Sequence, residues 1–207
     1  MNTKRRVCTS RENIVGETLK LFSLKGFHDT SINDILNATN LSKGAFYNYF
    51  KSKEEIFDAI LIEARKVWRF QMLHNINKPH REIDKVKKII MNFKNRYLKD
   101  DVHFPGGCVF VTLAVELDDH FPHYSELAEG FKQTRDLIEG FLAQAKDKGE
   151  IRSDISTKHI ASMIFSSIIG TAVVHTANKS KVILNTNINA IIQYLESIEI
   201  KSDSCGK

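Results

Sequence analysis

The stretch that most constrains this chain is residues 31–50, which read SINDILNATNLSKGAFYNYF. Ser31 and Asp34 have the S-x-x-D spacing of a capping box, in which two side chains satisfy backbone amides at a helix start. Apolar residues then follow at helical spacing, which gives the helix one buried face. The stretch therefore begins with a short amphipathic helix.

A second short helix is predicted after a tight turn. Asn40 tolerates the left-handed backbone conformation better than most residues, so it can make this turn, and Ser42 is placed to cap the helix that follows. Phe46 and Phe50 lie four residues apart and can be buried together. The opposite face is then left to a polar set: Lys43, Gly44, Tyr47 and Asn48.

Such a face is typical of a recognition helix that lies in the major groove of DNA. Asn48 can pair with an adenine edge, and Lys43 can contact guanine or a phosphate. Gly44 would allow the helix backbone to approach the DNA closely.

Residues 30–54, from Thr30-Ser31-Ile32 to Ser52-Lys53-Glu54, resemble the DNA-binding domain of the TetR/AcrR family of bacterial transcriptional regulators. Upstream, Ile14, Leu21-Phe22 and Gly26-Phe27 match that family's first helix and the turn after it. Two positions depart from the family pattern. Asn40 stands where glycine is usual, and Thr18 stands where a small alanine is usual in the first helix.

The resemblance implies an all-α fold with two domains. We expect a three-helix helix-turn-helix DNA-binding domain over residues 9–69, with its motif at about 32–51, and a larger helical effector-binding and dimerisation domain over 70–201. Lys53 stands where the family places a phosphate contact. The full set of residues expected to touch DNA is Thr30, Ser31, Ser42, Lys43, Gly44, Tyr47, Asn48 and Lys53.

Composition and charge agree with this interpretation. The chain has only three prolines and ten glycines and no strand-like alternation, which favours helices. Residues 1–69 hold 12 Lys and Arg against 8 Asp and Glu, a net charge of +4, whereas residues 70–207 hold 18 against 17, a net charge of +1. The basic excess thus lies on the part expected to meet phosphates.

Location is also indicated by the sequence. We find no apolar stretch of about 18 residues free of polar breaks, so we expect no membrane span. The start of the chain has basic residues but no apolar segment after them, unlike a secretory signal. Three scattered cysteines, Cys8, Cys108 and Cys205, fit a reducing cytoplasm.

Outside the motif, apolar periodicity and helix stops predict further helices at about 11–25, 52–74, 82–98, 109–120, 123–148, 157–176 and 185–200. The basic residues Lys4, Arg5 and Arg6 form either an arm that touches DNA or a solvated tail. The last two predicted helices are too apolar for lone surface helices, and we expect them to pair with those of a second subunit in a homodimer, as in the resembling family.

The resemblance also implies a cavity for an unknown small-molecule effector in the second domain. Its candidate lining is Trp68, Phe93, Tyr97, Cys108, Phe110, Glu116 and Phe165. Sequence alone does not separate such residues from core residues. The expected function is a DNA-binding transcriptional regulator, a repressor that its effector releases from the operator.

Two alternatives concern Cys108, which follows Gly106-Gly107 at a predicted helix start, where a thiol pKa can be lowered. One alternative is that the thiol is a redox or electrophile sensor that controls transcription, and the other is that it is the nucleophile of an enzyme. A third interpretation is that Cys108 is a small buried hydrophobe. The sequence contains no phosphate-binding glycine loop, G-x-S-x-G or H-E-x-x-H motif, so we expect neither enzyme activity nor a cofactor. Pro122 separates His120 from His123, and we expect no metal site there.

Overall fold

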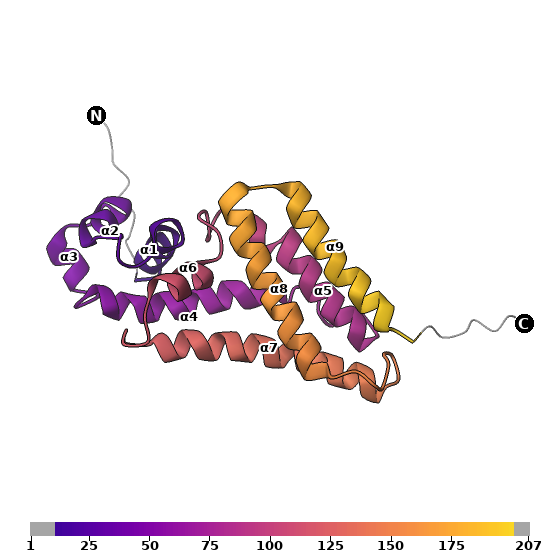
Figure 1. Cartoon of the computed structure of the whole chain (residues 1–207). Helices are drawn as coiled ribbons and strands as arrows, with labels where there is room; N and C mark the ends of the chain where they lie inside the picture. Colours follow the sequence, from indigo (N-terminus) through magenta and orange to yellow (C-terminus); the bar gives the residue numbers. More distant parts are fainter. Residues whose placement is uncertain (1–10, 201–207) are drawn as a thin grey trace, which may run out of the picture. The chain divides into compact units, whose positions relative to one another are not determined.

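The computed structural model describes residues 11–200 (Figure 1). Their regular elements are helices, apart from one isolated β-bridge between Ile151 and Glu199, which confirms the predicted all-α fold. The helices are α1 (Arg11–Lys25), α2 (Ile32–Thr39), α3 (Lys43–Tyr47), α4 (Lys53–Met72), α5 (Glu82–Asn95), the 3₁₀-helix η1 (Tyr97–Lys99), α6 (Val109–Glu116), α7 (Tyr124–Asp147), α8 (Thr157–Asn178) and α9 (Lys181–Ile198). The basic residues Lys4, Arg5 and Arg6, with Cys8 and Cys205, lie outside the described residues.

The first of two compact units, which we call the head, comprises the chain up to Val67 together with Asp101–Tyr124. It therefore holds α1, α2, α3, most of α4, and α6. Its core is rich in aromatic rings: the Phe27 ring lies 5.5 Å from that of Phe57 and 4.8 Å from that of Phe121, both edge-on. Because Phe121 comes from the second segment, the two segments share one core.

The second unit comprises Trp68–Asp100 and the chain from Ser125 onward. Within it, α5 packs against η1 and α9, and α9 packs against α8. The buried amide of Asn92 on α5 donates hydrogen bonds to Met72 O at 2.8 Å and to His74 O at 2.9 Å. These are carbonyls at and just beyond the end of α4, where the helix itself supplies no donor.

A buried carboxylate joins α5 to the end of α7 in this unit. Glu82 is only 3% exposed and accepts hydrogen bonds from Lys148 Nζ at 2.7 Å and Lys85 Nζ at 3.0 Å. These hydrogen bonds, the one from Lys148 first, lower the pKa of Glu82 below its ordinary value.

The observed helix ends show where local sequence signals predicted the end of a helix correctly and where they did not. Helix α1 has the predicted bounds and stops at Gly26, which has φ +81°. Helix α6 ends at Glu116, earlier than the predicted His120, because Leu117 is extended and the Asp118 side chain accepts from the His120 amide, a local turn that competes with the helix. Helix α5 ends at Asn95, where the chain leaves helical geometry and η1 follows.

Helix α9 begins at Lys181, earlier than predicted, because Ser180 caps it by accepting from the Ile183 amide at 3.3 Å. Helix α8 runs on to Asn178, and Lys179 ends it in the left-handed conformation.

Helix α8 also bears on the expectation of no membrane span. Over an 18-residue window its mean hydropathy is 1.6, so it is long and apolar enough to cross a membrane by length and composition. The interrupted apolar pattern read from the sequence therefore does not exclude a span there. Core helices of water-soluble proteins pass the same test, which makes this weak evidence. Only 33% of the window is buried, so α8 carries apolar surface that other helices of the described chain do not cover.

Candidate nucleic-acid interface

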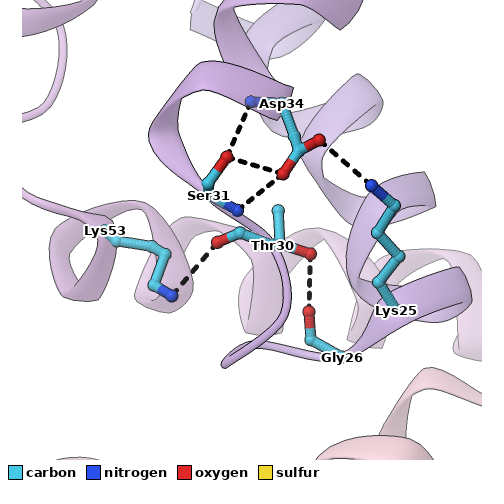
Figure 2. A network of polar contacts seen from close by, with 6 residues as sticks. All are labelled: Lys25, Gly26, Thr30, Ser31, Asp34 and Lys53. Carbon is cyan, nitrogen blue, oxygen red and sulfur yellow. Dashed lines mark hydrogen bonds and ion pairs between the residues drawn. The ribbon is translucent and has the colours of Figure 1, made fainter.

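The start of α2 is fixed by the predicted capping box (Figure 2). The Asp34 amide donates to Ser31 Oγ at 3.1 Å, and the Ser31 amide donates to Asp34 Oδ2 at 2.8 Å. Lys25 Nζ adds a hydrogen bond to the other carboxylate oxygen at 3.0 Å. The hydrogen bonds from the Ser31 hydroxyl and amide, and then that of Lys25, lower the pKa of Asp34 to about 2.

The turn between the two motif helices has the predicted geometry. Asn40 is left-handed, with φ 55° and ψ 34°, and its amide donates to Leu36 O at the end of α2. Ser42 then caps α3 by accepting from the Ala45 amide at 3.2 Å. Both helix ends are thus set by local hydrogen bonds, so α3 leaves α2 in a defined direction.

Helix α3 is held by its aromatic side. Phe46 and Phe50 are buried, and their ring centroids lie 5.9 Å apart. The polar residues predicted for the opposite side, Lys43, Gly44, Tyr47 and Asn48, are exposed, and so is the capping residue Ser42. A Cβ atom built on Gly44 meets nothing within 4 Å, so the backbone at this point faces open space.

Two residues predicted to touch DNA are engaged inside the head. The Thr30 side chain is fully buried, and its hydroxyl donates to Gly26 O at 2.6 Å (Figure 2). Lys53 Nζ donates to Phe27 O at 2.7 Å and Thr30 O at 3.1 Å. In this structure both residues brace the turn before α2, and a DNA contact by Lys53 would require its ammonium to leave these carbonyls.

The residues predicted to line an effector cavity fall into both compact units. Trp68, Phe93, Tyr97 and Phe165 belong to the second unit, whereas Cys108, Phe110 and Glu116 belong to the head. Within the second unit, Phe93 and Tyr97 are buried and their rings stack at 6.1 Å. Such stacking is also what core aromatics do, so it does not identify a cavity.

Cys108 lies at the N-cap of α6, as expected, and makes no side-chain cap hydrogen bond. Its exposed fraction is 8%, so an oxidant in solution has little access to the sulfur. This burial favours the interpretation of Cys108 as a packed small hydrophobe.

Sequence reasoning assigned Glu116 to an effector cavity, and its contacts in the head were not foreseen. Its carboxylate accepts hydrogen bonds from the amides of Phe27 and His28. A cation–π contact was not predicted either: the Arg11 guanidinium lies 4.9 Å from the ring centroid of Phe50, which follows α3 in the chain. Glu116 and Phe27 are 89 residues apart, so no local pattern could reveal this pair.

Two family models match the chain. Residues 14–60 match "Bacterial regulatory proteins, tetR family", and residues 83–191, more than half of the chain, match "Tetracyclin repressor-like, C-terminal domain". The chain belongs to the TetR family. It is therefore a DNA-binding transcriptional regulator with the two-part TetR architecture, an N-terminal helix-turn-helix domain and a larger C-terminal helical domain. The exact boundaries given above for the two domains stay a prediction.

Individual proteins are similar over most of their length. The HTH-type transcriptional repressor ComR of Escherichia coli is 25% identical over 171 residues, 79% of this chain and 78% of ComR. A TetR transcriptional regulator from Chloroflexus aurantiacus has the same fold, with a TM-score of 0.82 and 23% identity over 92% of this chain and 96% of that one. A cysteine mutant of the TetR family regulator CifR, in complex with double-strand operator DNA, superposes with a TM-score of 0.76 at 15% identity, over 94% and 99% of the two chains.

Proposed function

We propose that this TetR-family regulator represses transcription by holding a two-fold symmetric operator as a homodimer, and that a small-molecule effector releases it. The observation that carries the proposal is the exposed polar side of α3, fixed from behind by buried Phe46 and Phe50. The similarity to ComR, which is named a repressor, supports the sign of regulation.

The roles follow from side-chain chemistry. Lys43 and Asn48 reach base edges in the major groove, since lysine recognises guanine and asparagine recognises adenine. Tyr47 contacts phosphate through its hydroxyl, and the capping hydroxyls of Ser31 and Ser42 lie on the same exposed motif. Thr30, being buried, positions the turn before α2 rather than touching DNA, and Lys53 reaches a phosphate only if it leaves the carbonyls that it now binds.

The homodimer is supported by apolar surface on α8 and α9. Met163, Val173 and Val174 on α8, with Val182 and Ile183 at the start of α9, are exposed although they are apolar. Helices α8 and α9 pack against each other, so a second copy can cover both with one four-helix interface. Such an interface accounts for the uncovered apolar surface of α8 without a membrane, and it places two heads on one DNA site, as a palindromic operator requires.

The effector is expected to bind in the second unit, near Trp68, Phe93, Tyr97 and Phe165. It must bind better to the conformation whose heads do not fit the operator, because a ligand shifts an equilibrium only by its differential affinity. We expect no catalysis from this chain, and a site of action in the cytoplasm.

The test is selection of binding sites from a randomised duplex library, with the oligomeric state of the protein measured by analytical ultracentrifugation. The proposal predicts a dimer and a selected site made of two inverted half-sites, and an Asn48→Ala variant that selects a less defined sequence. A monomer, or a library from which no sequence is enriched, would contradict it.

A further inference from the structure

The turn between α1 and α2, residues 26–30, is held from two sides. On one side the amides of Phe27 and His28 donate to the Glu116 carboxylate at the end of α6, the first at 2.7 Å. On the other side its carbonyls accept from Lys53 Nζ at the start of α4: Phe27 O at 2.7 Å, Thr30 O at 3.1 Å and His28 O at 3.5 Å. The Lys53 ammonium also lies 4.2 Å from the Phe27 ring centroid.

The segment that leads into α6 lies directly against α1, and the Glu116 side chain reaches the turn that follows α1. A Cβ atom on Gly26 would lie 2.2 Å from a carboxylate oxygen of Glu116, so that oxygen sits against the Gly26 backbone. A Cβ atom on Gly106 would lie 1.8 Å from Ser23 O, and the Gly106 amide donates to Ser23 Oγ at 3.2 Å. The segment before α6 thus lies backbone to backbone on α1, and the Glu116 carboxylate lies against the Gly26 backbone at the start of the turn.

The turn leads directly into the DNA-reading motif. Its last residue, Thr30, precedes Ser31, the N-cap of α2, and the Thr30 hydroxyl closes the turn on Gly26 O (Figure 2). A shift of the turn therefore moves the capping box and, through the hydrogen-bonded turn between α2 and α3, the exposed side of α3. Binding of DNA tolerates little misplacement of base-reading side chains.

The two residues that hold the turn, Lys53 and Glu116, lie on segments that continue into the second unit. Helix α4 begins at Lys53 in the head and runs past Val67 into the second unit. The chain then re-enters the head at Asp101, forms α6, and leaves it after Tyr124. A rearrangement in the second unit has only these covalent routes into the head, and each route carries one of the two residues that hold the turn.

We propose that Glu116 is a positioning residue for DNA binding: its carboxylate holds the Phe27 and His28 amides so that α6 sets the orientation of the helix-turn-helix motif. Lys53 holds the opposite side of the same turn. When α6 moves away by more than a hydrogen-bond length, two amides lose a charged acceptor and the turn relaxes. The effect is graded by occupancy of these hydrogen bonds and needs no contact between Glu116 and either DNA or effector.

The inference rests on the proposed operator binding, and it adds a physical link by which a rearrangement in the second unit can regulate that binding. It also reassigns Glu116, which was predicted from the sequence to line the effector cavity. An acidic residue close to DNA would oppose binding by its charge, and its removal would strengthen binding. The proposed positioning role predicts the opposite effect, weaker DNA binding when Glu116 is removed. The direction of the change in affinity therefore distinguishes the two roles.

The experiment uses the full-length protein and its selected operator duplex. Glu116→Ala removes the acceptor, Glu116→Gln keeps one acceptor oxygen, and Asp119→Ala removes an exposed acid close by in the chain as a charge-matched control. Three quantities are measured: hydrogen exchange at the Phe27 and His28 amides, affinity for the operator, and affinity for a duplex of unrelated sequence. Thermal unfolding monitors global stability.

Glu116→Ala is expected to expose both amides to exchange and to weaken operator binding roughly five- to 150-fold, the usual range of coupling between sites. Binding to the unrelated duplex should change little, because the basic surface remains. Glu116→Gln should fall between Glu116→Ala and the wild type, and Asp119→Ala should match the wild type.

Unchanged operator affinity in a folded Glu116→Ala variant would overturn the inference, as would tighter binding or an equal loss on both duplexes. A wild-type protein that selects no DNA sequence would instead refute the proposed function. The two failures are therefore distinguishable.

Discussion

Replacing Gly44 by alanine separates the stability of the helix-turn-helix motif from its binding to DNA. Gly44 is the second residue of α3, has no positive φ, and would carry a Cβ in open space. Glycine is disfavoured in helices, and at a strain-free position Gly→Ala stabilises by about 0.4–1 kcal/mol. Because α3 has only five residues, we expect about 0.5 kcal/mol, or roughly 1–2 °C in Tm for a chain of this size.

The same methyl group should impair DNA binding. If the DNA backbone lies in the open space that a Cβ atom of residue 44 would enter, the alanine methyl group crowds the DNA in the complex. Overpacking typically costs about 1–3 kcal/mol, which corresponds to roughly a five- to 150-fold loss of operator affinity. The prediction is thus a more stable protein that binds its site less tightly.

Thermal unfolding and fluorescence anisotropy on the selected operator measure the two quantities. Gly140→Ala on α7 is the matched control, since its Cβ also meets nothing within 4 Å, and it should stabilise without a change in affinity. A Gly44→Ala protein that is stabilised and still binds the operator like the wild type would refute the placement of DNA against α3. Destabilisation would refute the interpretation of open space.

Three further predictions concern stability and titration. Gly26→Ala should destabilise by at least about 1 kcal/mol in urea unfolding, because φ is +81° at this position, and equal stability would contradict the assigned backbone. Ser31→Ala should cost about 1 kcal/mol as a lost N-cap and raise the pKa of Asp34 from about 2 toward 3.8, which an NMR titration follows; an unmoved pKa would show that the capping box is not its cause. Hydrogen bonds from Lys148 first, then Lys85, lower the pKa of Glu82 in the folded protein, so its contribution is complete above the ordinary value of 4.5 and is lost as pH falls toward the folded pKa. Glu82→Gln should therefore flatten the acid limb of a stability–pH curve, and an unchanged limb would count against this pair.

Local signals were enough for the motif. Ser31 and Asp34 predicted the start of α2, Asn40 the turn and Ser42 the start of α3, because each acts within four residues of itself. Gly26 likewise marks the end of α1. The predicted start of α6 was right and its predicted end was wrong, because the Asp118 turn competes with the helix and apolar periodicity gives no sign of that turn.

Long-range contacts were beyond such reasoning. Lys53 and Glu116 meet the same turn from sequence distances of 26 and 89 residues, and either could have been an ordinary surface charge. Thr30 was predicted to touch DNA, and the long-range packing that buries it was not foreseen: its hydroxyl donates to Gly26 O inside the head. Sequence reasoning predicted the exposed side of α3 and the burial of Phe46 and Phe50 behind it, and it missed the contacts of Lys53 and Glu116 that hold the turn before α2.

The central claim is that the exposed side of α3 reads bases, and the direct measurement is the affinity of Lys43→Ala for every single-base variant of the selected operator. Lys132→Ala, an exposed lysine on α7, is the control. We predict that Lys43→Ala loses about 1–3 kcal/mol of discrimination at one base pair in each half-site, while the control keeps the wild-type profile. An unchanged base preference in Lys43→Ala would contradict the claim.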